Sequence, residues 1–126
     1  FDDSFFLYFE ENDFCKRSIK FYKNYQINKI KVYHNAGNSV ITQSNNEKVN
    51  HENLRNWHFV WSKFYYLRKH YGYIPALIIF FPIIVRTIFR INFYKFKNDN
   101  KKVIKYQFRW SGLINSLLNN KSFKRI

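Results

Sequence analysis

The sequence predicts an α/β segment followed by a mainly α-helical, membrane-associated tail. Residues 27–34 alternate apolar and polar side chains after a short helical pattern, which favours one strand beside one helix. From Glu52 onward the apolar residues recur at three- and four-residue steps, as they do in long helices. A twelve-residue uncharged stretch then lies among basic residues, which is typical of a segment at a membrane surface. We therefore expect two parts, residues 1–48 and residues 49–126.

The expected elements of the first part are short. A helix begins near Asp13, whose side chain suits a helix cap, and continues to about Tyr22. The strand over residues 27–34 places Ile30 and Val32 on one face and polar side chains on the other. Together they predict the α/β character of this part.

The second part is expected to be helical throughout. A polar and flexible stretch, residues 42–50, precedes it. The first helix runs from about Glu52 to a stop at Gly72, because glycine commonly ends helices. Two more helical segments follow at about residues 73–94 and 101–118.

The charge is distributed very unevenly between the two parts. The formal net charge is +14, yet residues 1–54 hold seven Lys/Arg and seven Asp/Glu. Residues 55–126 hold fifteen Lys/Arg and a single acid, Asp99. Such asymmetry predicts an anionic partner, either a membrane surface or a nucleic acid. Cys15 is the only cysteine, so no intrachain disulfide can form and a reducing, cytoplasmic setting fits.

The uncharged stretch, residues 74–85, is short for a membrane-spanning helix, which needs about twenty apolar residues. Pro82 is also expected to kink a helix here. We therefore predict a helix or helical hairpin lying in the membrane interface, with Trp57 and Trp61 at headgroup depth and basic residues on anionic lipids. Two alternatives stay open: an apolar face packed on the rest of the protein, and a spanning helix over residues 71–91.

Three acids, Glu10, Glu11 and Asp13, lie within four positions behind a run of aromatic residues. An apolar approach to carboxylates suits a site that takes a proton from an alcohol, because partial burial raises the basicity of a carboxylate. The alternative is an acidic first turn that the helix dipole stabilises and that has no chemical role.

Residues 1–17, FDDSFFLYFEENDFCKR, resemble the acceptor-side motif of inverting family 2 glycosyltransferases, above all the rhamnosyltransferase-like members. Their pattern is close to FDExFFxYxEDxDLxxR. His34 and Ser39, in HNAGNS, look like the VxHxxGxS element near the donor diphosphate, and residues 109–121 resemble the closing RxxGLxDGLxGK. The resemblance implies the C-terminal portion of a GT-A (nucleotide-diphospho-sugar transferase) domain. Because the chain begins inside the motif, we expect the donor-binding half to precede it.

The resemblance also implies a role for each matching residue. Glu11 corresponds to the catalytic base, although the family usually has Asp there, and Glu10 to an acid that holds the acceptor. Asp13 and Arg17 form an ion pair that orients the site, with Arg17 and Ser39 toward the bound nucleotide-sugar. His34 is a ligand of a divalent metal, Mg²⁺ or Mn²⁺, whose other ligands lie upstream, or else a plain hydrogen-bonding residue.

The expected function is therefore the transfer of a sugar, with inversion, from a nucleotide-diphosphate sugar such as dTDP-rhamnose. The acceptor is a lipid-linked or cell-surface glycan, and the work is done at the cytoplasmic face of the membrane. The fragment alone is expected to be inactive. Two other readings stay open: a nucleic-acid-binding module that combines positive charge with aromatics, which the apolar stretch disfavours, and a non-catalytic membrane protein.

Overall fold

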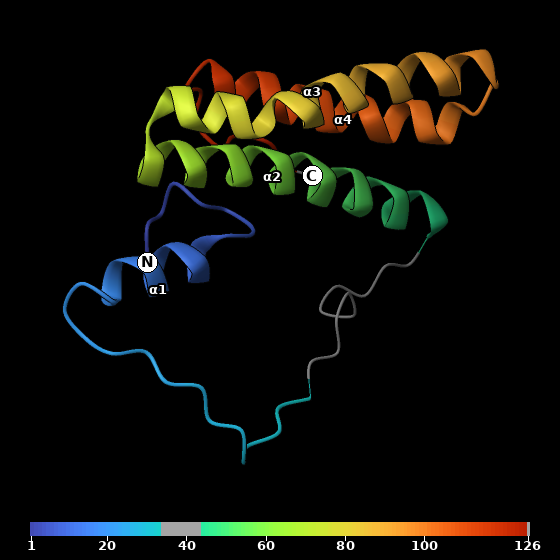
Figure 1. Ribbon diagram of the computed structural model, residues 1–126. Coiled ribbons are helices and arrows are strands. Elements are labelled where there is room, and N and C mark those ends of the chain that lie inside the picture. Colours follow the sequence, from blue (N-terminus) through green and yellow to red (C-terminus); the bar gives the residue numbers. More distant parts are fainter. Residues whose placement is uncertain (34–43, 126) are drawn as a thin grey trace.

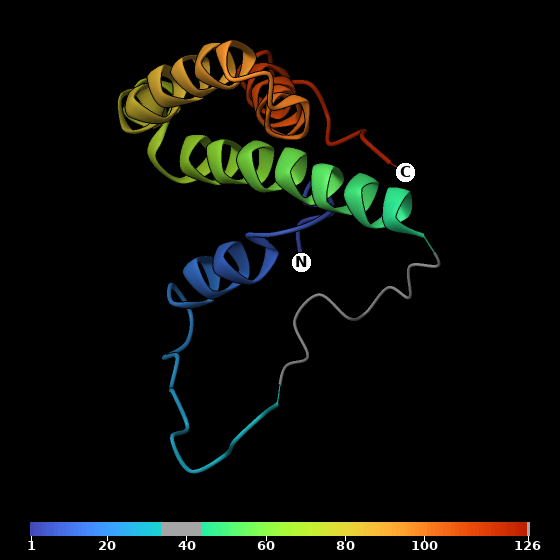
Figure 2. The same ribbon diagram turned by 90° about the vertical axis from the view of Figure 1, so that its right-hand side faces the viewer.

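Four helices make up the regular structure of the residues that the computed structural model describes, 1–33 and 44–125. They are α1 (Glu10–Ser18), α2 (Asn45–Tyr71), α3 (Tyr73–Phe96) and α4 (Asn100–Leu117). Helices α2, α3 and α4 run back and forth, each roughly antiparallel to the one before it, and they pack on one another (Figure 1). The short α1 lies against α2 on the side away from α3 and α4 (Figure 2).

Helix α2 is longer than the sequence indicated. It begins at Asn45, where the Ser44 hydroxyl accepts a hydrogen bond from the Glu47 backbone N–H at 3.2 Å. The expected start at Glu52 is wrong, because a Ser-x-x-Glu cap starts the helix one and a half to two turns earlier. Residues 45–50 are therefore helical rather than a flexible stretch. The expected end is confirmed: Gly72 follows Tyr71 with φ 90°, a conformation that favours glycine.

The core lies between the three long helices. Its fully packed centre consists of apolar side chains from all three of them, namely Val60, Phe64, Ala76, Phe80 and Leu113. Beside it, α4 approaches α2 at Gly112, where an added Cβ would lie only 2.4 Å from the Trp57 carbonyl oxygen. Only glycine permits that approach, so one residue fixes how close the two helices come.

The two tryptophans of α2 belong to the interior. Trp57 and Trp61 are 0% and 2% exposed. Their ring N–H groups donate to Ser111 Oγ at 3.2 Å and to the Asn120 carbonyl at 3.1 Å. Their expected place at lipid headgroup depth is therefore wrong: each ring packs inside the protein and finds its hydrogen-bond partner there.

Helix α3 is one continuous helix of 24 residues that contains Pro82, so residues 74–85 form no hairpin. Among the described residues it is the one helix long and apolar enough, by length and composition, to cross a membrane. Most of its apolar residues are exposed rather than packed on the bundle. They form a surface stripe that we call the α3 apolar stripe: Ile74, Ile78, Phe81, Val85, Ile88, Phe89 and Phe96.

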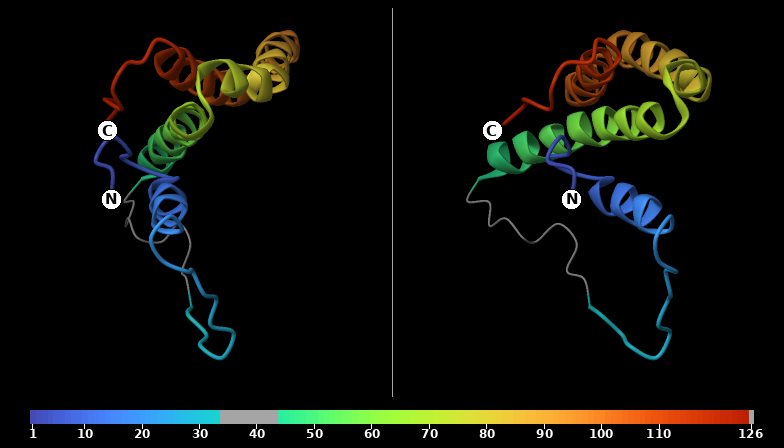
Figure 3. Two further views of the ribbon diagram at one scale, coloured as in Figure 1. Left: turned by 60° about the vertical axis from the view of Figure 1, so that its left-hand side comes forward. Right: turned by 90° about the vertical axis from the view of Figure 1, so that its left-hand side faces the viewer.

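The predicted α/β fold class, and with it the GT-A portion, is wrong. Helices account for all regular secondary structure in residues 1–33 and 44–125. Residues 27–33 form irregular chain that extends away from the helices (Figure 3), and Ile30 and Val32 are 64% and 85% exposed. A strand needs a neighbour that satisfies its backbone groups, and the described chain places none beside this segment. His34, the last residue of the expected strand, lies outside the described residues.

Candidate functional site

The aromatic run ahead of the acids packs on α2. Phe5 meets the Tyr65 ring edge-on, with centroids 4.9 Å apart, and Phe9 contacts Phe59 and Tyr66. The Leu7 carbonyl accepts a hydrogen bond from the Ser62 hydroxyl at 2.7 Å. These contacts anchor the chain immediately before α1 and so determine where its first turn begins.

The backbone turns sharply into α1. Tyr8 and Phe9 take φ values of 68° and 70°, a left-handed conformation that costs a non-glycine residue about 1 kcal/mol. Phe9 occupies the N-cap, so the expected cap by Asp13 is wrong. Asp13 lies inside the helix instead, four residues further on, and points toward α2.

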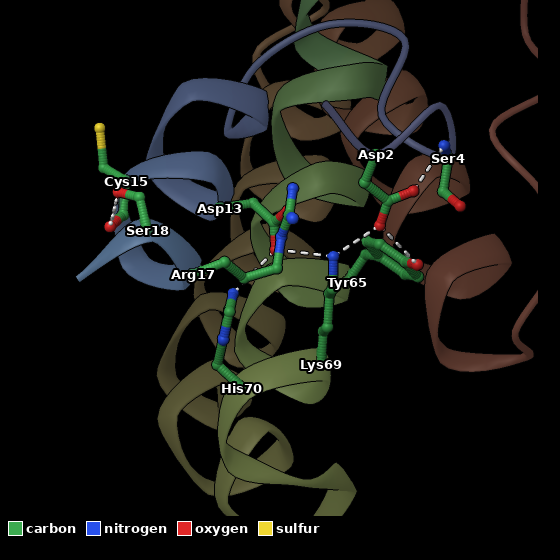
Figure 4. Close-up of polar contacts among 9 residues, drawn as sticks. All are labelled: Asp2, Ser4, Asp13, Cys15, Arg17, Ser18, Tyr65, Lys69 and His70. Atoms are coloured by element: carbon green, nitrogen blue, oxygen red, sulfur yellow. Dashed lines mark hydrogen bonds and ion pairs between the residues drawn. The ribbon is translucent and has the colours of Figure 1, made fainter. Parts of the chain in front are cut away.

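Asp13 is the buried centre of a partly exposed ion-pair cluster between α1 and α2 (Figure 4). Its carboxylate is 0% exposed and accepts from Arg17 Nε at 2.8 Å, which is the ion pair expected from their spacing. Two partners come from α2: Lys69 Nζ at 2.7 Å and His70 Nε2 at 2.9 Å. Burial acts to raise the pKa of Asp13, but these three hydrogen bonds outweigh it and the pKa falls below 3.8. Asp13 is therefore an anion held in place.

The cluster continues toward the N-terminus through Lys69. The same Nζ donates to Asp2 Oδ2 at 2.7 Å, and the Tyr65 hydroxyl donates to that oxygen at 3.3 Å. The Ser4 backbone N–H donates to the other Asp2 oxygen at 2.8 Å. Although burial opposes it, this set of donors lowers the pKa of Asp2 to about 2. Lys69 thus ties both ends of the N-terminal segment to α2.

The other two acids of α1, Glu10 and Glu11, have no such partners among the described residues. Glu11 is exposed on the first turn of α1, and no hydrogen bond or ion pair engages it within the part of the chain described. Glu10 is half-buried, and its Oε2 is shielded from solvent without a hydrogen-bond partner among residues 1–33 and 44–125. A shielded carboxylate oxygen normally has a donor, so Glu10 Oε2 reaches a new hydrogen-bond partner only when the side chains that cover it move.

A cleft of about 470 Å³ opens beside the Asp2 end of the cluster. Its lining combines aromatic rings with amide, hydroxyl and charged groups: Asp3, Ser4, Trp61, Tyr65, Asn119, Asn120, Lys121, Ser122 and Arg125. The C-terminal wall is held by buried His58, whose Nε2–H donates to the Lys124 carbonyl at 2.8 Å while Nδ1 accepts from the Ser122 hydroxyl at 3.0 Å. Burial lowers the pKa of His58, which keeps the ring neutral for both bonds.

The structure brings some of the expected site residues together and leaves others out. Glu10, Glu11, Asp13 and Arg17 all lie on α1, and only the last two bond to each other. His34 and Ser39 lie outside the described residues. Elsewhere, no three His, Cys, Asp or Glu side chains gather as metal ligands within residues 1–33 and 44–125. The cationic partners of Asp13 leave it no place in a metal shell.

Lys69 and His70 are the functional-site residues that the sequence did not reveal. They follow the acids by more than fifty positions, and His70 seemed only a polar residue near the end of a helix. A weak signal exists: Lys69 and Tyr65 are one helical turn apart, on a face that the aromatic run also covers. Their pairing with Asp13 depends on how α1 docks, which no local pattern encodes.

Comparison with protein-family models, with curated proteins and with solved structures finds no match for this chain.

Proposed function

We propose that this chain carries the acceptor side of an inverting glycosyltransferase that uses a nucleotide-diphosphate sugar. The donor class, dTDP-rhamnose included, follows from the resemblance of residues 1–17 to family 2 glycosyltransferases. One observation carries the proposal furthest: the acids divide into two kinds. Asp13 accepts hydrogen bonds from three donors, whereas no described side chain bonds to the carboxylates of Glu10 and Glu11.

Glu11 is proposed to act as the general base. An acceptor hydroxyl attacks the anomeric carbon of the donor, the bond from that carbon to the diphosphate oxygen breaks, and the diphosphate leaves on the opposite face. The hydroxyl proton passes to the Glu11 carboxylate, so no covalent enzyme intermediate is needed. Glu10 is proposed to help hold the acceptor, which requires the side chains that cover its Oε2 to move. Arg17 and Asp13 hold α1 on α2 and so position both acids.

The cleft beside Asp2 is proposed to bind a part of the glycan acceptor away from the reacting hydroxyl, since neither Glu10 nor Glu11 lines it. Aromatic rings and amide groups in one pocket suit a sugar, whose faces are partly apolar and whose rim carries hydroxyls. The roles proposed for Glu10 and Glu11 involve no metal ion. A divalent ion at His34 stays a prediction about a residue outside the described part of the chain.

Membrane attachment is the second component of the proposal. The α3 apolar stripe faces outward, with Ile78 68% and Phe81 62% exposed. Together with the basic residues of the second part it suits the cytoplasmic surface of a membrane with anionic lipids, where a lipid-linked acceptor is found. The stripe is what separates this proposal from nucleic-acid binding, which needs charge but no exposed aliphatic surface.

Glu11→Gln tests the catalytic proposal. Transfer from labelled nucleotide-sugar is measured in membranes that contain the full-length gene product. The substitution removes the base but keeps the shape, so we expect turnover to fall by about two to four orders of magnitude while donor binding persists. Glu52→Gln is the matched control. It removes an acid of α2 that pairs with Lys105 of α4, and it should leave turnover within about twofold of the wild type. Normal turnover of Glu11→Gln would exclude Glu11 as the base.

A further inference from the structure

A second, smaller pocket lies between α3 and α4, away from the acids of α1. It has a volume of about 180 Å³ and is lined by three arginines with one tyrosine, one threonine and one isoleucine: Arg86, Arg90, Arg109, Tyr106, Thr87 and Ile83. Two arginines come from α3 and the third from α4. We call it the arginine pocket.

Within residues 1–33 and 44–125, no acid neutralises the positive charge of this pocket. In the described part of the chain none of the three arginines forms an ion pair with an acid, and Arg90 donates to the Tyr106 hydroxyl instead. Asp99, the only acid after Glu52, pairs with Lys102 at 2.9 Å. Burial lowers the pKa of Arg109, Tyr106 acts in the opposite direction, and repulsion from Arg86 and Arg90 lowers it further. Such a cluster is unfavourable until an anion enters it.

The chemistry of the pocket selects the type of anion. Guanidinium groups offer paired N–H donors that match the oxygens of a phosphate, and several of them can share one phosphate group. The pocket presents donors and no acidic acceptor, so a dianionic phosphate fits better than a neutral polar group. A volume of about 180 Å³ leaves room for a phosphate or diphosphate and for little else.

The surroundings indicate what the phosphate is attached to. Arg86, which is itself exposed, lies one helical turn from Phe89, and Phe89 is 65% exposed in the α3 apolar stripe. A charged pocket at the edge of an exposed hydrocarbon-like surface matches an amphiphile rather than a soluble anion.

We propose that the arginine pocket binds the phosphate or diphosphate group of a lipid whose hydrocarbon chain lies along the α3 apolar stripe. The identification of that lipid with the acceptor's own phosphorylated carrier rests on the proposed glycosyltransferase function. Because the pocket and the acids lie on opposite sides of α2, the glycan between the lipid phosphate and the reacting hydroxyl must be long enough to pass around the bundle.

Vesicle binding by the purified chain tests the proposal. Vesicles of phosphatidylcholine contain either phosphatidic acid, a phosphomonoester, or phosphatidylglycerol at equal surface charge. We expect tighter binding to phosphatidic acid, and we expect Arg86→Gln/Arg109→Gln to lose about tenfold or more of it. Lys95→Gln/Lys101→Gln removes the same charge from the same two helices outside the pocket and should lose no more than about threefold.

A conservative variant separates a built site from general attraction. Arg109→Lys keeps the charge but loses the planar fork, so phosphatidic acid binding should weaken several-fold while phosphatidylglycerol binding stays unchanged. Circular dichroism establishes that each variant is folded. Equal losses in the pocket and control double variants, or an unaltered lipid preference in Arg109→Lys, would overturn the pocket.

Two further arms identify the source of the phosphate and keep the two proposals apart. If inorganic pyrophosphate binds as tightly as phosphatidic acid vesicles do, the ligand is a soluble phosphate and the lipid assignment is wrong. Glu11→Gln should bind phosphatidic acid vesicles like the wild type, because its carboxylate is not in the pocket. The two experiments therefore test separate proposals. Normal sugar transfer by Glu11→Gln would exclude the base but not the arginine pocket, and failure of the vesicle experiment would exclude the pocket but not the base.

Discussion

Asp13 is an anion without solvent contact, and its stability depends on the three donors around it. Removing one member of a buried ion pair leaves the others uncompensated. We expect Asp13→Asn to lower the free energy of unfolding by about 3 kcal/mol and to loosen α1 from α2. Chemical denaturation followed by tryptophan fluorescence measures the change. Asp3→Asn, at an acid with no ion pair in the described structure, is the control and should change stability by less than about 0.5 kcal/mol.

The same residue predicts an acid-dependent loss of stability. The pKa of Asp13 is lowered in the folded protein, so its contribution is complete above the unfolded-state value of 3.8 and is lost as the pH falls below it. Asp2 adds a contribution of about 2 kcal/mol that disappears between about pH 4 and pH 2. In Asp13→Asn the stability should therefore fall less steeply over this acid range. An identical slope in the variant would contradict the ion-pair assignment.

How far single residues could be predicted depended on the distance to their partners. The Asp13–Arg17 pair follows from four-residue spacing on a helix, and the structure confirms it. The His70 contact with Asp13 joins residues 57 positions apart, and no local pattern reports it. The predicted helix cap at Asp13 was wrong for a related reason. Packing of the aromatic residues on α2 places the N-cap of α1 at Phe9, so Asp13 lies inside the helix. Long-range packing decided what local propensity could not.

At the scale of the helices, Gly112 sets the spacing between α4 and α2. An alanine there improves helix propensity by about 1 kcal/mol, but its Cβ would lie 2.4 Å from the Trp57 carbonyl oxygen, a backbone atom that cannot rotate away. We therefore expect Gly112→Ala to destabilise the protein by about 1–3 kcal/mol, because α4 must move. Thermal unfolding measures it. Gln107→Ala, at an exposed position of α4, should be neutral or slightly stabilising. A more stable Gly112→Ala would show that the helices can separate without cost.

The elements themselves were predictable wherever one helix carried enough internal signal. The end of α2 at Gly72 and the positions of α3 and α4 followed from glycine and from apolar spacing. The predicted strand was wrong. Alternating apolar and polar residues over 27–34 permit a strand only beside a neighbouring strand, and the described chain supplies no such neighbour. Pro82 does not end α3, which continues through it within a 24-residue helix, and the expected kink stays a prediction.

In the whole molecule, charge and apolar surface are combined on the α3–α4 side, while the acids lie on the opposite side of α2 (Figure 2). Residues 55–126 carry fifteen Lys/Arg and one acid, and the α3 apolar stripe emerges among them. Under the proposed membrane attachment, α3 is the side that meets the membrane and the acids face away from it. Coulombic attraction and apolar insertion then act at the same face, and only the first is sensitive to salt.

That difference allows the membrane proposal to be tested against nucleic-acid binding. Binding to phosphatidylglycerol vesicles should fall with salt to a plateau, because insertion of apolar side chains is not screened. Ile78→Ser/Phe81→Ser, at two largely exposed positions, should remove about 3 kcal/mol of apolar transfer, or roughly a hundredfold, and abolish the plateau without unfolding the bundle. Phe21→Ser, at an exposed aromatic beyond α1, is the control and should keep it. The opposite result is that wild-type vesicle binding vanishes at high salt and that binding of single-stranded DNA is steeply salt-dependent. Counterion release alone would then drive association, and the basic surface would be a nucleic-acid site.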